Sequence, residues 1–162
     1  MPTVSNPRSD PAKRAAAYAT FRPRRSRIVS IVAAVATVVV FAIVGIQVPR
    51  GGENGWSGQD SVALVVFGVA IALFLLRYAL VHAKPTESGL HVQNLISSRD
   101  IPWAEIVNVQ FGGGPPWLIL ELADTETLSV MAVQRSDGDR AMAEAQRLAA
   151  LVDAHNHTAR DD

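Results

Sequence analysis

The sequence of 162 residues contains no cysteine. A chain without cysteine has no disulfide framework, no thiolate metal site and no cysteine nucleophile. Zinc ribbons, iron–sulfur proteins and disulfide-stapled secreted domains are therefore excluded. The chain also has no net charge, because 15 Lys and Arg residues balance 15 Asp and Glu residues. Its overall electrostatics consequently offers no argument for nucleic-acid binding.

The balanced total conceals a strong segregation of charge along the chain. Residues 1–27 carry seven Lys or Arg residues and one acid, Asp10, which amounts to +6. Residues 85–162 carry five Arg residues and twelve acids, which amounts to −7. Residues 28–49 carry no charge at all. Such asymmetry predicts that the parts of the chain lie in different environments.

Two apolar stretches predict a pair of membrane-spanning helices, at residues 28–48 and 61–81. The first has 21 uncharged residues, and a helix of that length covers about 31 Å, close to the thickness of a hydrocarbon core. In the second, the uncharged run ends at Arg77, whose long side chain can extend to the headgroups. The alternatives are a buried core helix or a cleaved signal peptide for the first stretch, and an interfacial helix for the second.

Basic residues predict the orientation of this helical hairpin. Arginines cluster before the first span, and Arg77 and Lys84 lie at the far end of the second, whereas the loop at residues 49–60 has one Arg. The positive-inside rule therefore places both termini in the cytoplasm and the loop outside the plasma membrane. Trp56 and Tyr78 suit the aromatic belts of a bilayer. The residues predicted to set the topology or to lie at the membrane interface are Arg22, Arg24, Arg25, Arg27, Trp56, Arg77, Tyr78 and Lys84.

The segment at residues 1–27 has few large apolar residues and is predicted to be a basic, mostly disordered cytoplasmic tail. Its residues 13–21 are compatible with two helical turns. Near an anionic leaflet each basic residue contributes about 1 kcal/mol of attraction, so the tail is either a lipid anchor or only a topology signal. No feature of the tail reads nucleic-acid bases, and nucleic acid is not an expected partner.

From Pro85 onward the pattern changes to that of a small antiparallel sheet. In one of the strands, Val107, Val109 and Phe111 alternate with polar residues and are expected to face the core. Short loops between the strands favour pairing of sequence neighbours. The five predicted strands cover residues 90–94, 95–101, 107–111, 117–122 and 127–133.

An amphipathic helix is predicted after the strands, near residues 136–155. Ser136 and Asp139 have the spacing of a capping box, and Arg140 can pair with Glu144 one turn later. The helix would cover the sheet and so bury both apolar faces, leaving residues 156–162 as a tail. Its expected apolar stripe consists of Met142, Ala145, Leu148, Ala149 and Val152.

The sequence Gly89-Leu90-His91-Val92, followed by Ile101-Pro102-Trp103 and by Glu105-Ile106, resembles the pleckstrin-homology-like (PH-like) domains of bacteria. More narrowly, residues 62–155 are similar to the small membrane-anchored PH-like proteins of actinobacteria related to low molecular weight protein antigen 6. The resemblance implies a membrane α-helical hairpin plus an α+β domain at residues 85–155: a small antiparallel PH-like sheet or partial barrel capped by a C-terminal helix. A full PH barrel has seven strands, so five predicted strands indicate a barrel that is incomplete or partly closed by its own tether.

The sequence shows no signature of an enzyme. The glycines at 112–114 are followed by two prolines, which lack the N–H groups that a phosphate loop needs. His155 and His157 lack the further ligands of a metal site, and no pair of carboxylates or nucleophile motif is present. We therefore expect no catalytic residue, cofactor, metal or small-molecule substrate. Residues 85–101 hold one cation, Arg99, so the domain is not expected to bind lipid headgroups.

These observations predict a non-enzymatic integral membrane protein whose PH-like domain serves protein–protein interaction or scaffolding at the cytoplasmic face of the cell envelope. The expected partners are the lipid bilayer and either another protein or a second copy of the chain. Trp103 and Trp117 are the candidate residues of the interaction surface. Two alternatives remain: a lipid-sensing module that uses the basic tail, and an accessory subunit of a membrane transporter or enzyme complex.

Overall fold

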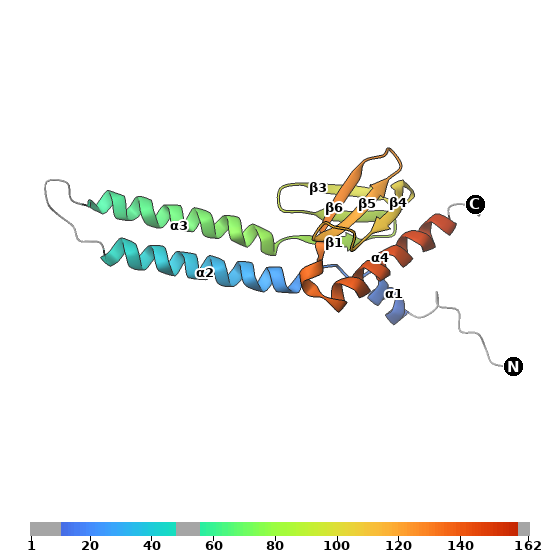
Figure 1. Cartoon of the computed structure of the whole chain (residues 1–162), viewed down its shortest axis with the longest axis horizontal. Helices are drawn as coiled ribbons and strands as arrows, with labels where there is room; N and C mark the ends of the chain where they lie inside the picture. The colour runs from blue at the N-terminus through green and yellow to red at the C-terminus, as the bar shows by residue number, and fades with distance from the viewer. Residues whose placement is uncertain (1–10, 48–55, 159–162) are drawn as a thin grey trace. The chain divides into compact units, whose positions relative to one another are not determined.

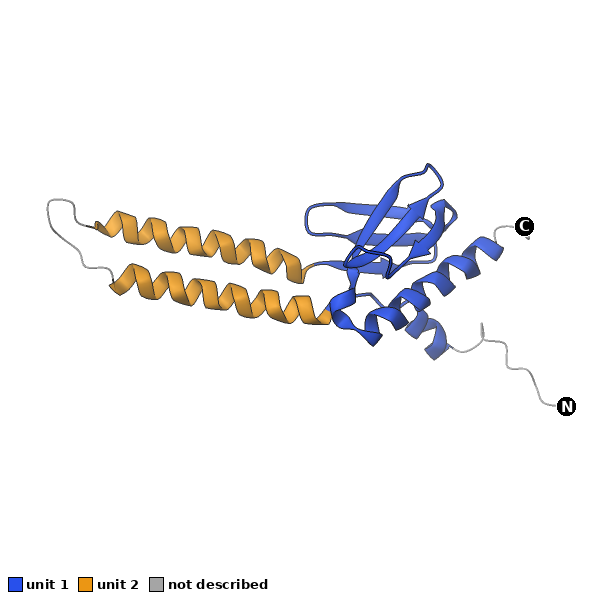
Figure 2. Cartoon of the chain, in the orientation of Figure 1, with its two compact units in different colours: residues 1–23, 81–162 blue, residues 24–80 orange. Residues whose placement is uncertain are grey.

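The computed structural model describes residues 11–47 and 56–158 (Figure 1). The chain divides into two compact units, which Figure 2 distinguishes by colour. Residues 24–80 form one unit, which we call the hairpin. The other unit contains residues 1–23 and 81–162, and we call its described residues, 11–23 and 81–158, the domain. The domain thus includes the segment that precedes the hairpin in the sequence.

The hairpin consists of helices α2 (Arg24–Gln47) and α3 (Gly58–Ala79). Both helices are long and apolar enough to cross a membrane. Helix α2 begins four residues before the predicted span and includes three arginines, while α3 begins at Gly58 and ends two residues before Val81. Most large apolar side chains point away from the helix contact and are exposed. The buried residues are Ser30, Ala34 and Gly45 in α2, and Ser61, Gly68 and Ala72 in α3.

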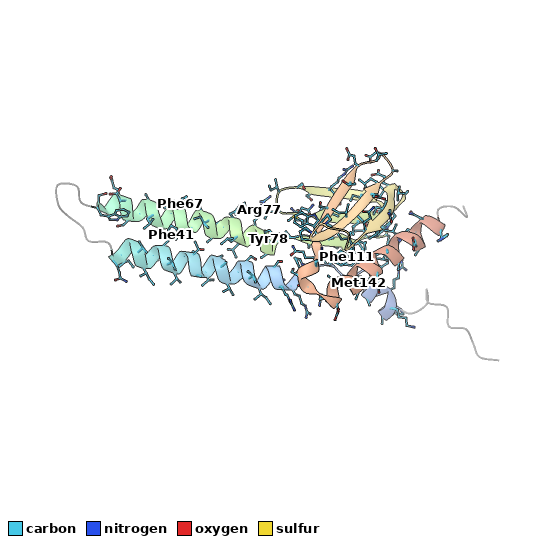
Figure 3. All side chains as sticks on the ribbon, viewed as in Figure 1. Phe41, Phe67, Arg77, Tyr78, Phe111 and Met142 are labelled. Atoms are coloured by element: carbon cyan, nitrogen blue, oxygen red, sulfur yellow. The ribbon has the colours of Figure 1, made fainter. Side chains whose placement is uncertain are left out.

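The contact between α2 and α3 depends on these small residues. A Cβ atom on Gly68 would lie 2.5 Å from the Cβ of Phe41, closer than any real contact, so only glycine permits this approach. A Cβ on Gly45 would meet a methyl group of Val65 at 3.2 Å. The rings of Phe41 and Phe67 lie 6.0 Å apart in a tilted pair (Figure 3). Close packing at small residues is the usual way in which apolar helices associate in lipid.

Helix α3 starts with a complete capping box. The side chain of Ser57 accepts a hydrogen bond from the Asp60 amide, and the Asp60 carboxylate accepts one from the Ser57 amide. The Trp56 indole donates to Ser61 Oγ at 2.8 Å. Within the predicted loop 49–60, the last three residues therefore belong to α3, and residues 48–55 lie outside the described part of the chain.

The domain contains two three-stranded antiparallel sheets, each with its strands in sequence order. The first sheet comprises β1 (His82–Pro85), β2 (Gly89–Gln93) and β3 (Ser98–Pro102). The 3-10 turn η2 (Trp103–Glu105) connects it to the second sheet. The second sheet comprises β4 (Ile106–Gln110), β5 (Trp117–Leu122) and β6 (Thr127–Gln134). A second turn, η3 (Arg135–Asp137), leads to helix α4 (Asp139–Thr158). The antiparallel pairing of neighbours and the C-terminal helix confirm the predicted fold class.

Strand β1 is one more strand than the sequence predicted. The predicted second span includes Val81, but this residue and Ala83 lie in the core of the domain and are 2% and 0% exposed. Ala83 pairs with Val92 in the sheet. The strand escaped prediction because its inward positions after Val81 are Ala83 and Pro85, which do not have the large β-branched side chains typical of strands.

Strand β4 differs from the predicted alternation because it contains a register shift. Ile106 pairs with Leu122 and Asn108 pairs with Glu121, so Val107 is an extra residue on one strand. Such a bulge reverses the faces of the residues around it. Val107 is consequently 64% exposed, and its expected place in the core was wrong, while Val109 and Phe111 are partly buried against the core.

Helix α4 covers the core through Ala141, Ala145, Leu148 and Val152, which are all buried. The predicted stripe was wrong at Met142, whose side chain is 50% exposed and is labelled in Figure 3. The expected capping box is also absent from this described helix: it begins after Gly138, which has a φ of +61°, and the Ser136 hydroxyl instead contacts Gln134. The predicted pair of Arg140 and Glu144 is present at 3.4 Å.

Residues 11–23, which we call the N-terminal segment, are an ordered part of the domain. Helix α1 (Pro11–Ala17) is followed by an extended stretch in which Phe21 is fully buried in the core. This differs from the mostly disordered tail that we expected at residues 1–27. The aromatic residues Tyr18 and Phe21 supply the apolar surface that fixes the segment, and residues 1–10 lie outside the described part of the chain.

Candidate functional site

The candidate functional features of this chain are surfaces and grooves. Among the described residues, no group of three or more His, Asp or Glu side chains could hold a metal ion. Every buried side-chain nitrogen or oxygen in that same part of the chain has a hydrogen-bond partner. Among the described residues the candidate features are therefore binding surfaces, and one of them holds the N-terminal segment against the domain.

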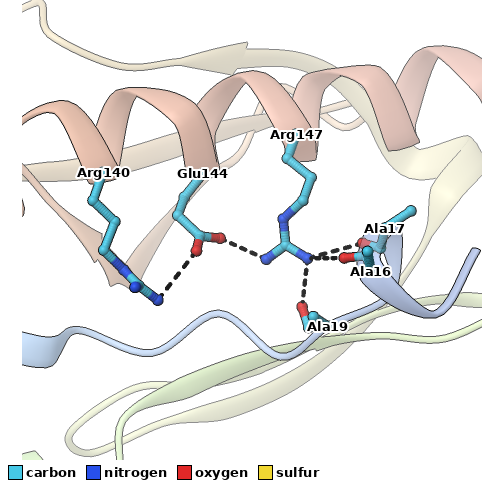
Figure 4. A network of polar contacts seen from close by, with 6 residues as sticks. All are labelled: Ala16, Ala17, Ala19, Arg140, Glu144 and Arg147. Atoms are coloured by element: carbon cyan, nitrogen blue, oxygen red, sulfur yellow. Dashed lines mark hydrogen bonds and ion pairs between the residues drawn. The ribbon is translucent and has the colours of Figure 1, made fainter. Parts of the chain in front are cut away.

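Arg147 of α4 binds the C-terminal end of helix α1 (Figure 4). Its Nη1 donates to the carbonyl oxygens of Ala16, Ala17 and Ala19 at 2.9, 3.0 and 2.8 Å. Carbonyl groups at the end of a helix lack intrahelical partners and carry partial negative charge, so a guanidinium suits them. Its Nη2 bonds Glu144 Oε2 at 2.5 Å, which holds the side chain in place.

Phe21 joins the N-terminal segment to the first sheet. Its amide donates to the Ala83 carbonyl at 2.8 Å, and the Ala83 amide donates to the Phe21 carbonyl at 3.1 Å. This antiparallel bridge occupies the outer edge of β1. The ring lies 3.8 Å from the Arg147 guanidinium, a cation–π contact. The N-terminal segment thus covers part of the outer edge of β1.

A second cluster fixes the same segment through aromatic side chains. His155 stacks on Trp103 with a centroid distance of 4.7 Å, and its Nε2 lies 2.9 Å from the Tyr18 hydroxyl. The Trp103 indole donates to the Thr86 carbonyl at 3.0 Å. Trp103 is only 4% exposed. It therefore belongs to the core and cannot form the interaction surface that we expected it to form.

The edges of the two sheets differ in what covers them. Asn94 caps the edge of β6, because its Nδ2 donates to the Ser129 carbonyl at 2.7 Å and its Oδ1 accepts from the Met131 amide at 3.1 Å. The bridge from Phe21 covers β1. The outer edges of β3 and β4 pair with no other strand in the described part of the chain. Of these two strands, β4 presents the large exposed apolar side chain of Val107.

Strand β3 is lined by ion pairs. Arg99 donates to Glu126 at 2.8 Å, and His91 contacts Asp100 at 2.6 Å. The hydrogen bond to Glu126 raises the pKa of the Arg99 guanidinium above its ordinary value. Because these exposed charges are already engaged, this edge is less suited than that of β4 to an apolar strand.

The basic residues predicted at the membrane interface gather at one end of the hairpin. Arg24, Arg25 and Arg27 lie in the first turn of α2. Arg77, which Figure 3 labels, lies in the last turn of α3. Residues Arg27 and Arg77 line one groove, of about 460 Å³. The remaining lining residues are apolar: Ile31, Leu73, Leu76, Ala79 and Leu80. The two ends of the hairpin sequence thus contribute to a single site.

The other predicted interface residues are dispersed. Arg22 is exposed and lies between α1 and α2 in the sequence, and Tyr78 is half-buried in the last turn of α3. Trp56 precedes the N-cap at the other end of α3 and bonds Ser61. Lys84 is exposed on β1 and borders a second groove, of about 450 Å³, beside α1. Trp117, the other expected interaction residue, is half-buried at the start of β5.

The second groove is less suited to an anion than its basic residues suggest. Arg14 lies in it and pairs with Glu87 at 2.7 Å, so the acid offsets the charge of the base. The remaining lining includes Pro11, Tyr18 and Pro85. The groove at the arginine end of the hairpin has no acid among its lining residues.

Comparison with known proteins agrees with this architecture. A family model described as a bacterial PH domain matches residues 83–150. The uncharacterized protein Rv1417 of Mycobacterium tuberculosis is 33% identical over 122 residues, which cover 74% of this chain and 79% of that relative. The uncharacterized protein Mb1452 of Mycobacterium bovis matches to the same extent. No solved structure matches the chain.

The matched region runs from the second residue of β1 to the middle of α4 and so includes all six strands. Both relatives are mycobacterial, in agreement with the resemblance to actinobacterial PH-like proteins. The chain belongs to the bacterial PH domain family.

Proposed function

We propose that this chain is a non-enzymatic integral membrane protein that displays its PH-like domain at the cytoplasmic face of the plasma membrane for contact with another protein. The observation that carries the proposal is the combination of two exposed apolar helices with a domain in which β4 has no outer strand partner among the described residues and presents the exposed side chain of Val107. At the start of this strand, the Ile106 carbonyl accepts a hydrogen bond from Asn156 of α4 at 3.1 Å. Large apolar side chains on the outside of a helix pair require an apolar surrounding. The domain, in contrast, has a conventional buried core.

The bridge between Phe21 and Ala83 supports a two-span topology. Phe21 precedes α2 and Ala83 follows α3, yet both belong to one unit. This bridge supports a topology in which the two chain segments that flank the hairpin lie on the same side of the membrane. The arginines at that end of α2 and α3 favour the cytoplasm for this side by the positive-inside rule.

The outer edge of β4 is the part of the domain best suited to a protein partner. An exposed strand edge binds an extended peptide through main-chain hydrogen bonds, and neighbouring side chains give specificity. Val107 supplies an apolar contact at this edge and is 64% exposed. The bulge that turns Val107 outward is a local irregularity of a kind often found at functional edges.

Site-specific photocrosslinking in native membranes tests the proposal. A photoreactive residue at Val107 is expected to capture one partner whose identity mass spectrometry establishes, while the same residue at Met142 is not. Met142 is a matched control because it is apolar and 50% exposed on α4. Adducts of equal amount and identity from both positions, or adducts with lipid alone, would contradict a partner at β4.

Substitution of Val107 makes the test quantitative. Val107→Lys introduces the charge that natural proteins use to protect strand edges and should sharply reduce recovery of the crosslinked partner. Val107→Thr keeps the β-branched shape and should retain most of it. Since the side chain is exposed, neither change should alter the midpoint of thermal unfolding by more than a few degrees.

A further inference from the structure

We infer that the groove lined by Arg27 and Arg77 is a binding site for an anionic phospholipid, with the phosphate between the two guanidinium groups and an acyl chain along the apolar lining. The inference rests on the proposed insertion of the hairpin into a membrane. It extends that proposal by assigning a specific lipid site to the hairpin, separate from the domain and from its β4 edge.

The groove is lined by both basic and apolar side chains, which suit the phosphate and the acyl chain of a phospholipid. Arg27 comes from the first turn of α2 and Arg77 from the last turn of α3, so the two helices each supply one guanidinium. Arginine binds phosphate through paired hydrogen bonds. The volume of about 460 Å³ falls within the range of roughly 300–1,000 Å³ typical of small-ligand sites.

The apolar part of the groove distinguishes a lipid from a soluble anion. Ile31 on α2 faces the groove together with Leu73 and Leu76 on α3. These side chains are 39%, 63% and 39% exposed, so they offer open apolar surface rather than a closed pocket. A free phosphate would use the arginines alone, whereas a phospholipid would cover both kinds of surface. Basic pockets between helices at the cytoplasmic side are known sites for anionic headgroups.

The distribution of charge in the hairpin favours an anion at this end. Asp60 is the one acid in residues 24–47 and 56–80, and it lies in the first turn at the opposite end of α3. The first turn of α2 contains three arginines and no acid. Positive charge at a helix N-terminus is unfavourable for the helix dipole. A bound phosphate would place negative charge at this helix N-terminus, where it is favourable.

The test uses the full chain, purified in detergent and titrated with phosphatidylglycerol or phosphatidylcholine while retained lipids are counted by native mass spectrometry. Wild-type protein should retain one phosphatidylglycerol in preference to phosphatidylcholine. Loss of both guanidinium contacts to the phosphate predicts an affinity lower by about 10-fold or more for the double variant Arg27→Gln/Arg77→Gln. The matched control, Arg24→Gln/Arg25→Gln, removes the same amount of charge from the same end of the hairpin, but from residues that do not line the groove, and should lose much less affinity.

A second variant probes the apolar half without changing any charge. Leu73→Trp fills the groove and should reduce retention of phosphatidylglycerol, while binding of inorganic phosphate would be unaffected. Equal losses in the two double variants, or displacement of the lipid by millimolar inorganic phosphate, would overturn the assignment. If the groove variants leave lipid retention unchanged while the protein stays in membranes and still crosslinks through position 107, the lipid site fails and the proposed function stands.

Discussion

Replacement of Arg147 by glutamine should release the N-terminal segment from the domain. In the structure one nitrogen of this side chain, Nη1, donates to three carbonyl oxygens of residues 16–19, and the guanidinium lies over the ring of Phe21. The shorter, neutral amide of a glutamine would retain neither the charge nor the reach for these contacts. The segment would then be held mainly by the buried Phe21 ring and by the contact of Tyr18 with His155.

The magnitude follows from the geometry of the contact. A terminal guanidinium nitrogen carries two hydrogens, so three acceptors must share them and their contributions do not add fully. Hydrogen bonds from a charged donor contribute about 1.5–3 kcal/mol each, and a partly buried cation–π contact contributes about 1–2 kcal/mol. Because the side chain is mostly buried, with 22% exposure, we expect a total loss of about 2–3 kcal/mol for release of the segment.

Amide hydrogen exchange provides the assay. The amides of Phe21 and Ala83 donate to each other's carbonyls, so their exchange reports opening of the bridge. A loss of about 2–3 kcal/mol should accelerate their exchange by roughly 30- to 150-fold in Arg147→Gln, if exchange occurs through local opening. Amides of β5, which lies in the middle of the second sheet, should change much less.

Arg140→Gln is the matched control for this prediction. Arg140 also contacts Glu144 from α4, but at 3.4 Å and with 41% exposure, whereas the bonds to the carbonyls of residues 16–19 come from Arg147 (Figure 4). Its replacement should leave exchange at Phe21 and Ala83 nearly unchanged, as expected for an exposed ion pair. If the two variants accelerate exchange equally, or if neither does, Arg147 does not hold the segment.

Two further predictions concern the two units separately. Gly68→Val should separate α2 from α3, because even a Cβ at this position would lie 2.5 Å from Phe41. The thermal unfolding midpoint of the protein in detergent should therefore fall. A midpoint that stayed at the wild-type value would argue against the close contact. Asn94→Ala should destabilise the domain by about 1–3 kcal/mol, since it removes both hydrogen bonds from the β6 edge. Denaturant unfolding of the full chain measures this change. Asn94→Asp keeps the acceptor oxygen and should lose less stability.

The sequence predicted the elements that are marked by a pattern within their own residues. The hairpin helices followed from long uncharged runs, and β5 followed from the alternation of Leu118, Leu120 and Leu122, all of which are buried. Strand β1 and the outward turn of Val107 could not be predicted in this way. The first depends on pairing with β2, and the second depends on a register shift against β5.

The contacts of the N-terminal segment were missed for a related reason. In a basic stretch with many small residues, Tyr18 and Phe21 were the only signal of packing, since they are the sole aromatic residues among positions 1–27. Arg147 could be placed on the polar side of α4, but its acceptors lie more than a hundred residues away along the sequence. Periodicity identifies which face of a helix is polar, and it does not identify the segment that this face binds.

Because Phe21 lies in the core, the domain includes residues that precede the hairpin as well as those that follow it. The family match begins at residue 83, yet a fully buried ring at residue 21 and its bridge to Ala83 complete the first sheet. Loss of a buried Phe side chain costs about 3–5 kcal/mol, which is a large part of the roughly 5–15 kcal/mol that stabilises a typical domain. A fragment that begins at Val81 would lack this side chain. The domain is therefore completed only when the chain on both sides of the hairpin is present, so that its stability depends on the same connection that attaches it to the two helices.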